Sequence, residues 1–173
     1  MTKCPFCDAE NIEGIDVCEQ CEQPLTEEYL HDPATAVERG LLADHIDVLN
    51  PKPPVVVAPD MATRDVIRLM VDRNIGSVLV VKDEHLIGIF SERDALMKLN
   101  AEAAQLSDRP VSEFMTKKVQ TLDSHAKIAF AVQRMDLGSF RHVPVVNQAG
   151  EPVGVISVRD ILRYITDRSA EPV

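Results

Sequence analysis

The stretch Gly88-Ile89-Phe90-Ser91-Glu92-Arg93-Asp94-Ala95-Leu96 returns near the C-terminus as Gly154-Val155-Ile156-Ser157-Val158-Arg159-Asp160-Ile161-Leu162. Each copy has a glycine, an apolar strand end and a serine, followed by an arginine and an aspartate at the start of an apolar-periodic segment. A repeat that served packing alone would keep its apolar pattern first, whereas this one keeps its polar residues best. We therefore expect the two copies to form the functional surface.

The repeat extends well beyond these two stretches. Met135 follows Met70 by 65 residues, and Ser157 follows Ser91 by 66, so one extra residue must lie in the polar turn 148–151. Each copy predicts a strand, a helix, a strand, a hairpin turn, a strand and a helix. A unit of about sixty residues is too small to bury a large core alone, so we expect the two copies to pack together as one α+β domain.

The composition is that of a globular protein, with 45% apolar and 27% charged residues in a chain of 173. Only 4% of residues are aromatic and none is Trp, so the core must be aliphatic. The runs Val78–Val81 and Val143–Val146 fit strands that are buried on both faces. No apolar run approaches the roughly 20 residues of a membrane span, and the N-terminus lacks the apolar core of a signal peptide. We therefore expect a cytoplasmic protein without a membrane partner.

The formal net charge of −10 is unevenly distributed. Residues Met1–Leu30 contain eight acidic side chains and a single lysine, so seven of the ten negative charges lie there. Nucleic-acid affinity depends strongly on lysine and arginine side chains that neutralise phosphates. This distribution argues against a nucleic-acid partner, although a local basic corner can still bind one nucleotide.

All four cysteines lie in the first 21 residues, as two Cys-x-x-Cys pairs separated by ten residues: Cys4, Cys7, Cys18 and Cys21. Two such pairs can supply four thiolates to a tetrahedral metal, with Zn–S bonds of about 2.3 Å. The alternatives are two disulfides or a redox-active pair, which the missing export signal and the doubling of the motif disfavour. The spacing predicts a structural Zn²⁺ site, which would supply folding energy to a segment with few apolar residues.

The N-terminal segment also resembles the small zinc ribbons that open many microbial proteins. Such ribbons usually have glycine after the second cysteine of each pair, where this chain has Asp8 and Glu22. Nearby His31 is interpreted as a solvated linker histidine, because four thiolates already complete a structural site.

A linker follows the ribbon. Ala34–Leu49 has apolar residues at helical spacing and predicts a helix that packs on the following domain. The proline-rich stretch Asn50–Pro54 ends it, because proline cannot continue a helix. The expected organisation is a zinc ribbon over residues 1–30, a linker helix over 31–50, and the two repeats over 51–106 and 107–173.

The repeated polar residues allow two interpretations. A serine three residues before an aspartate at a helix start is close to a capping box, in which each side chain bonds the other residue's backbone N–H. However, a glycine that permits close approach, a helix N-terminus and an arginine between serine and aspartate together make an anion site. The carboxylate could also accept hydrogen bonds from the two hydroxyls of a ribose. Phosphate and ribose together indicate a nucleotide.

The doubled Gly-x-x-Ser-x-x-Asp motif, with His142-Val-Pro-Val-Val146 before the second hairpin, resembles a tandem pair of cystathionine β-synthase (CBS) domains over about Asp44–Ile165. The resemblance implies two βαββα units packed sheet to sheet, with two clefts that bind AMP, ADP, ATP, NAD(H) or S-adenosylmethionine. It also implies a homodimer formed through helices, for which the apolar faces of Val66–Met70 and Ile128–Met135 are candidate surfaces.

The resemblance further implies roles for individual residues. The aspartates would hold ribose and the serines would approach phosphate, in the pairs Ser91 with Asp94 and Ser157 with Asp160. Arg93 and Arg159 would assist the serines, or else be exposed helical side chains.

The two copies differ where family members often place a phosphate-binding cation. Arg141 and His142 enter the strand of the second copy, where the first has Gly76 and Ser77. The two clefts are therefore expected to be unequal. The alternative for His142 is a hydrogen-bonded histidine at a strand edge.

These observations favour a regulatory protein that senses adenine nucleotides, carries a structural zinc ribbon and acts on an unknown protein partner. The sequence contains no nucleophile paired with a base, no Walker loop and no open metal site, so we expect no enzymatic activity. One alternative is a protein-interaction scaffold with empty clefts. Another is a DNA-associated regulator that binds DNA through the zinc ribbon, which the acidic charge of that segment disfavours.

Overall fold

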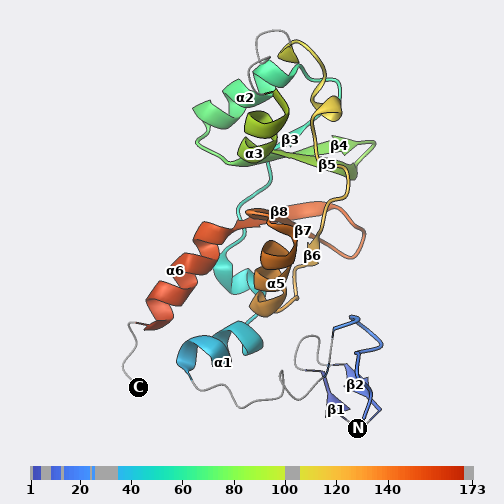
Figure 1. Ribbon diagram of the computed structural model, residues 1–173, viewed down its shortest axis with the longest axis vertical. Helices are drawn as coiled ribbons and strands as arrows, with labels where there is room; N and C mark the ends of the chain where they lie inside the picture. The colour runs from blue at the N-terminus through green and yellow to red at the C-terminus, as the bar shows by residue number, and fades with distance from the viewer. Residues whose placement is uncertain are drawn as a thin grey trace. The chain divides into compact units, whose positions relative to one another are not determined.

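The computed structural model describes residues 2–4, 9–12, 14–23, 25, 35–99 and 106–169 (Figure 1). Cys7, Asp8 and His31, which were discussed above, lie outside these residues. The η elements are short 3-10 helices, except η3, which is π-helical. The elements in chain order are β1 (Thr2–Lys3), β2 (Glu10–Asn11), α1 (Ala36–Ala43), η2 (Ile46–Leu49), β3 (Val56–Val57), α2 (Thr63–Asp72), β4 (Ser77–Lys82), β5 (His85–Ser91), α3 (Glu92–Asp94), η3 (Ala95–Leu99), η5 (Val111–Glu113), β6 (Leu122–Asp123), α5 (Ile128–Gly138), β7 (His142–Val146), β8 (Pro152–Ser157) and α6 (Val158–Ser169).

The chain forms two compact units that alternate along the sequence. The first unit combines 1–51, 124–141 and 156–173, and the second combines 52–123 and 142–155. Within the described part of the chain, no helix combines the length and the apolar character that a membrane span requires.

Two three-stranded sheets repeat the same pairing. In the order β3-β4-β5, β3 runs parallel to β4, and Val57 lies opposite Val80. In the order β6-β7-β8, β6 runs parallel to β7, and Leu122 lies opposite Val145. Both residues of the second pair lie 65 positions after those of the first, so the predicted register of the repeat is confirmed.

The extra residue of the second copy lies in its hairpin, as predicted. The β4–β5 turn has two residues between Lys82 and His85, and both take positive φ angles, of 49° and 67°. The β7–β8 loop has three residues between Asn147 and Glu151, with Gly150 at φ 80°. The Asn147 side-chain oxygen accepts hydrogen bonds from the Ala149 and Glu151 N–H groups and so closes the longer loop.

The segments that lead into the two repeats are exchanged. His45, just before η2, pairs with Lys127 at the start of α5, in the second repeat. Pro110, just before η5, pairs with Ala62 at the start of α2, in the first repeat. Each leading segment therefore packs on the helix of the other repeat, which explains why the two units alternate along the chain. The sequence pattern did not predict this exchange.

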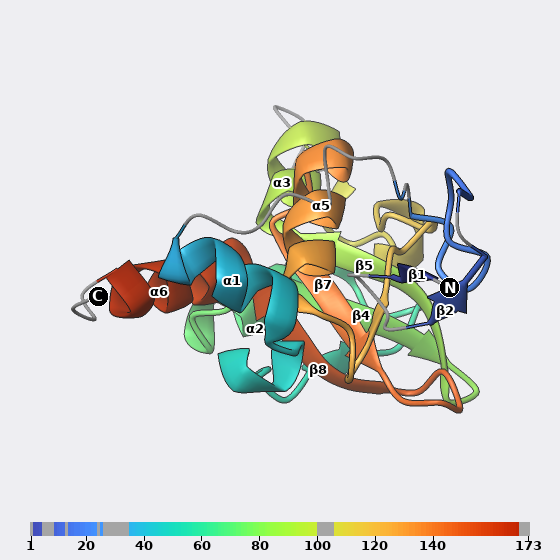
Figure 2. The ribbon, with the colours of Figure 1, turned by 90° about the horizontal axis from the view of Figure 1, so that it is seen from below.

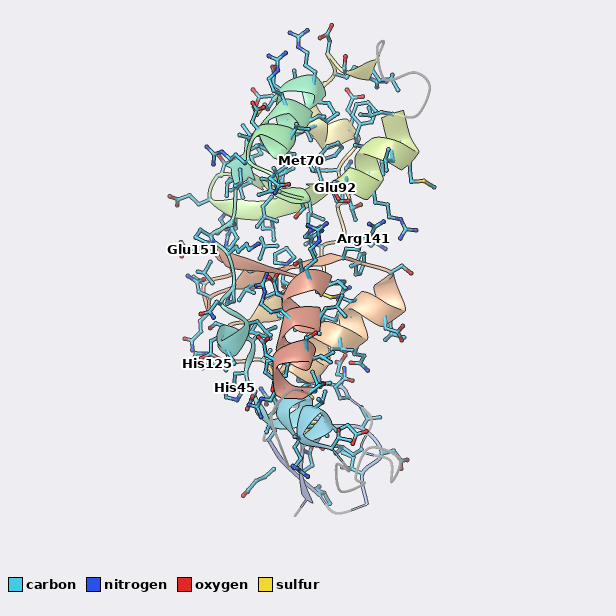
Figure 3. The ribbon with its side chains drawn as sticks, turned by 90° about the vertical axis from the view of Figure 1, so that its left-hand side faces the viewer. His45, Met70, Glu92, His125, Arg141 and Glu151 are labelled. Carbon is cyan, nitrogen blue, oxygen red and sulfur yellow. The ribbon has the colours of Figure 1, made fainter. Side chains whose placement is uncertain are left out.

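The core of the second unit lies between the β3-β4-β5 sheet and α2, where Figure 3 labels Met70. Val78, Val80 and Phe90 from the sheet are fully or almost fully buried there. Burial of each such side chain contributes about 1.5–3 kcal/mol to stability. The run of apolar residues predicted to be a doubly buried strand is confirmed as β4.

The apolar helix faces that were candidates for a dimer surface are buried inside the chain. Val66 and Met70 on α2 are 0% and 5% exposed, and Ile128 and Met135 on α5 are 0% and 7% exposed. Val66, Met70, Ile128 and Met135 are therefore core and not dimer surface, whereas Val132, on the same α5 segment, is 37% exposed.

The predicted linker helix is shorter than expected. Helix α1 ends at Ala43, and Asp44 is extended, with φ −79° and ψ 145°. The Asp44 carbonyl accepts the Ile128 N–H at 3.0 Å, and the Ile46 N–H donates to the Ala126 carbonyl at 2.9 Å. These bonds to the start of the second-repeat helix override the helical periodicity. Figure 2 shows α1 beside α5 and α6 in the first unit.

Candidate functional site

The first candidate corner, Ser91–Asp94, lies where β5 passes into α3. The Ser91 N–H donates to Asp94 Oδ2 at 2.9 Å, and the Ser91 hydroxyl donates to the same oxygen at 2.6 Å. The Asp94 N–H lies 3.3 Å from the Ser91 hydroxyl oxygen, which completes a capping box. The cap uses only Oδ2, so Oδ1 is left for other partners.

The second corner, Ser157–Asp160, repeats this arrangement at the junction of β8 and α6. The Ser157 N–H and hydroxyl donate to Asp160 Oδ2 at 2.8 and 2.6 Å. Asp160 is 5% exposed and Asp94 is 8% exposed. The structure therefore places both predicted aspartates in the same buried and capped position.

An equivalent backbone hydrogen bond occurs at each corner. The Glu92 N–H donates to the Gly76 carbonyl, and the Val158 N–H donates to the Arg141 carbonyl, both at 3.0 Å. Gly76 and Arg141 are therefore structural counterparts, as the alignment of the two copies predicted.

The two corners differ at the second carboxylate oxygen. Asp94 Oδ1 accepts the Thr116 hydroxyl at 2.8 Å and lies 2.7 Å from the Lys98 ammonium. Burial tends to raise the pKa of Asp94, but hydrogen bonds from Lys98, Ser91 and Thr116, with the positive charge of Lys98, outweigh it and lower the pKa below its ordinary 3.8. The Asp94 carboxylate is thus held ionised.

Among the described residues of its own unit, Asp160 Oδ1 has no comparable partner. In the part of the chain that the structure describes, the only cationic group within 4 Å of it is Arg163 Nη1, at 3.7 Å, from a side chain that is 65% exposed. The counterpart of Lys98 in the second copy is Tyr164, whose hydroxyl donates to Asp44 at 2.6 Å. The charge that neutralises Asp94 is thus absent from the corresponding position of α6.

The predicted basic residues occupy different environments. Arg93, Arg159 and Arg141 are exposed, and Figure 3 labels Arg141 where the chain leaves α5 for β7. His142 is half-buried, and its ring lies so close to Gly76 that a methyl group there would be 2.6 Å from Cε1. Gly76 therefore provides room for the His142 ring, a role beyond the missing cation that the sequence suggested.

Sequence reasoning missed Lys98 and Thr116. Lys98 stands four residues after Asp94 on the same helical segment, a spacing that brings opposite charges together and could have been noticed. Thr116 lies 22 residues away and reaches the corner because its backbone pairs with Ile89 of β5. No local pattern signals such a contact.

Three of the four cysteines gather into one cluster in the N-terminal segment. The sulfur atoms of Cys4, Cys18 and Cys21 lie within 4.8 Å of one another, and those of Cys4 and Cys21 are 3.7 Å apart. A tetrahedral zinc ion with Zn–S bonds of about 2.3 Å holds its sulfur atoms about 3.8 Å apart. Cys7 lies outside the described residues. The three described sulfur atoms fit a metal centre and are not joined by disulfides.

The surroundings of Cys18 favour a thiolate. Burial raises the pKa of its thiol, but hydrogen bonds from the Cys21 and Gln20 backbone and from the Asn11 and Cys21 side chains outweigh this and lower the pKa from 9.0 to about 6. The side chain of Asn11 is buried and also accepts the Glu19 N–H at 3.1 Å, which ties β2 to the second cysteine pair.

Glu22 shows why a glycine is usual after the last cysteine of a ribbon. Its φ is 57°, in the left-handed region that glycine adopts at little cost. Its N–H donates to the Cys18 carbonyl at 2.8 Å, so the turn closes the cysteine pair despite this conformation.

Comparisons with known proteins agree with the repeat. The family model for the CBS domain matches residues 46–101 and 111–167. An uncharacterized 17.7 kDa protein of Acidianus ambivalens is 30% identical over 113 residues, which cover 65% of this chain and 67% of that protein. The CBS domain-containing protein CBSX3 of Arabidopsis thaliana is 30% identical over 117 residues, but the match covers only 56% of its length.

Solved structures of CBS proteins share the fold. The CBS domain pair of protein MJ0100, in complex with 5-methylthioadenosine and S-adenosyl-L-methionine, superposes with a TM-score of 0.63, at 22% identity over 70% of this chain and 98% of that one. CBSX2 in complex with AMP gives a TM-score of 0.60, at 21% identity over 71% of this chain and 96% of that one.

Proposed function

This chain belongs to the CBS domain family, and on that premise we propose that it is a regulatory protein that binds an adenosine-containing nucleotide. Asp160 and Asp94 hold the ribose hydroxyls in this proposal, and Ser157 and Ser91 approach the phosphate. In this proposal the chain catalyses no reaction. It transmits the effect of nucleotide binding to a protein partner that is not identified. The adenosine ligands of MJ0100 and CBSX2 support the ligand class.

The observation that carries the proposal is that the two oxygens of the Asp160 carboxylate have different surroundings. Oδ2 is held by the Ser157 N–H and hydroxyl, which fixes the orientation of the group. Oδ1 remains able to accept hydrogen bonds. Among the described residues of its unit, its nearest cation is the exposed Arg163, and 3.7 Å is too long for a hydrogen bond. A buried, oriented carboxylate with one available oxygen is suited to accept hydroxyl hydrogen bonds from a ribose.

A thermal-shift panel tests this function. AMP, ADP, ATP, NADH, S-adenosylmethionine and cyclic di-AMP are added to the full chain and to the Asp160→Asn variant, which keeps the shape of the side chain. A ligand at 100 times its Kd should stabilise the folded chain by about 2.7 kcal/mol, and the variant should lose much of that gain. If no adenosine compound shifts the unfolding temperature, the scaffold with empty clefts is the better account.

We also propose that Cys4, Cys7, Cys18 and Cys21 hold a structural zinc ion. The distance of 3.7 Å between the Cys4 and Cys21 sulfur atoms supports this proposal, as does the thiolate environment of Cys18. Four thiolates leave no open position for substrate, so the metal would supply folding energy and no chemistry.

Metal analysis tests the zinc proposal. Freshly prepared, reduced protein should contain about one zinc ion per chain, and Cys18→Ser should lose it. Chelation should remove ordered structure from the N-terminal segment alone. Protein that contains no zinc would refute the proposal. Salt-dependent retention of the zinc-loaded chain on DNA would instead favour the DNA-associated regulator.

We keep the homodimer as a proposal that rests on the family resemblance. Among the described residues, the apolar side chains exposed on α2 and α5 are Val71, Val132 and Leu137, and Val71 and Leu137 are more than 70% exposed. A dimer through helices would cover such positions. A monomeric mass in solution at micromolar concentration would refute it.

A further inference from the structure

The acceptor positions of the Asp94 carboxylate are all occupied from within the chain. A carboxylate offers about four such positions, two on each oxygen. The Ser91 N–H and hydroxyl take those of Oδ2, while the Thr116 hydroxyl and the Lys98 ammonium take those of Oδ1. A ribose hydroxyl can therefore bind Asp94 only after one of these partners has left.

The Lys98 ammonium is itself well satisfied at this position. It donates to the Phe114 carbonyl at 2.7 Å and lies 3.4 Å from the Thr116 hydroxyl oxygen, in addition to its contact with Asp94. These three acceptors match the three N–H bonds of an ammonium group. Lys98 thus joins the π-helical turn η3 to the segment that leads into the second repeat, and it occupies the place of an external ligand.

No such internal ligand lies at the corner around Asp160 in the part of its unit that the structure describes. Position 164 corresponds to Lys98 and carries a tyrosine, whose hydroxyl is directed to Asp44 at 2.6 Å. The nearest cation among the described residues is Arg163, at 3.7 Å and largely exposed. Among the described residues of its unit, Oδ1 of Asp160 can therefore still accept hydrogen bonds from a ligand. The acceptor positions on Oδ1 of Asp94 are already occupied.

We propose that Lys98 determines the order in which the two corners are occupied. The nucleotide binds first at Asp160, and it binds at Asp94 only at a higher concentration, when its ribose displaces the Lys98 ammonium. This inference rests on the proposed function and assigns to it a specificity-determining residue. A chain built in this way responds to two ranges of nucleotide concentration.

The expected change in affinity depends on how exposed the Lys98 and Asp94 side chains are. The Lys98 side chain is 38% exposed and that of Asp94 is 10% exposed, so solvent screens part of the attraction. Removing the ammonium should tighten binding at the Asp94 corner by about two- to fivefold. Weaker binding in the Lys98 variants would contradict the proposal. It would mean that the displaced Lys98 binds the ligand phosphate.

The test is calorimetric titration of AMP into the full chain and its variants. Lys98→Met keeps the aliphatic stem and removes the charge, and Lys98→Gln is a second neutral variant. Lys118→Met is the matched control, because Lys118 is exposed and lies beyond the corner. The wild type should bind one equivalent of AMP tightly, at the Asp160 corner, and a second more weakly, at the Asp94 corner. Asp160→Asn should remove the tight binding.

Lys98→Met should tighten AMP binding at the weak site by about two- to fivefold, and the gain should persist in the Lys98→Met, Asp160→Asn double variant. Lys118→Met should change neither. If AMP binds but the weak site is unchanged or weaker in both Lys98 variants, the role of Lys98 is wrong while the proposed function stands. If AMP binds neither the wild type nor any variant, the proposed function fails and the inference fails with it.

Discussion

A methyl group added to Gly76 would lie 2.6 Å from Cε1 and 2.7 Å from Nε2 of His142, closer than real carbon contacts allow. The absence of a side chain at Gly76 is thus what lets the His142 ring lie against β4. Gly76→Ala should force the ring or the strand to move and should lower the free energy of unfolding by about 1–3 kcal/mol. Urea denaturation of the variant and the wild type measures this loss.

A double-mutant cycle identifies the cause. If the ring is what the methyl group meets, Gly76→Ala should cost much less in a His142→Ala background, with a coupling of about 0.5–3 kcal/mol. Equal costs in the two backgrounds would show that the strain lies in the backbone.

The lowered pKa of Asp94 predicts a pH dependence. Because the folded pKa lies below the ordinary 3.8, the stability that this group contributes is fully present above about pH 3.8 and is lost as the pH falls through the folded value. Asp94→Asn should remove this part of the acid dependence, and Lys98→Met should reduce it by raising the pKa of Asp94. Urea midpoints measured from about pH 5 to about pH 2 test this, and an unchanged slope in Asp94→Asn would contradict it.

The contact of Tyr164 with Asp44 joins α6 to the end of α1. The Tyr164 hydroxyl donates to Asp44 Oδ2, and the Arg168 guanidinium donates to the same oxygen. Tyr164→Phe removes one partly buried hydrogen bond to a charged group and should cost about 1.5–3 kcal/mol. Arg168→Met should cost less, about 1 kcal/mol, because Arg168 is a third exposed. Chemical denaturation of both variants measures the ranking, and a larger loss for Arg168→Met would contradict it.

The left-handed conformation of Glu22 predicts a stabilising change. A non-glycine residue there costs about 1–2 kcal/mol, so Glu22→Gly should strengthen metal binding by about fivefold or more. Gln20→Gly in the same turn is the control, because the φ of Gln20 is not positive and glycine there should weaken the turn. Competition with a chelator measures both affinities. A gain in both variants would attribute the effect to the loss of side-chain bulk and not to the left-handed conformation.

The repeat made most of the fold predictable. The motif around Ser91 and Ser157 predicted the tandem CBS pair, which is confirmed, and the offset of 65 to 66 residues located the extra hairpin residue. Both serine–aspartate corners lie where the sequence placed them, because strand-to-helix junctions are set by local patterns. The zinc ion, the nucleotide and the dimer remain predictions.

Features that depend on long-range contacts were not predictable. The helix expected to reach Leu49 ends at Ala43, because backbone bonds from Asp44 and Ile46 to the second repeat are worth more than continued helix. Thr116 reaches Asp94 through strand pairing that leaves no local signature. The difference between the corners was attributed to Arg141, whereas within the described units it is most evident at Lys98 and Tyr164.

The most direct test of the central claim is to compare AMP with 2′,3′-dideoxy-AMP in equilibrium titrations of the full chain. If Asp160 and Asp94 bind the ribose diol, loss of both hydroxyls leaves a buried carboxylate oxygen without its partner. Since a hydrogen bond to a charged group contributes about 1.5–3 kcal/mol, the dideoxy compound should bind about 10- to 100-fold more weakly. Equal affinities for the two compounds would show that the carboxylates are helix caps only.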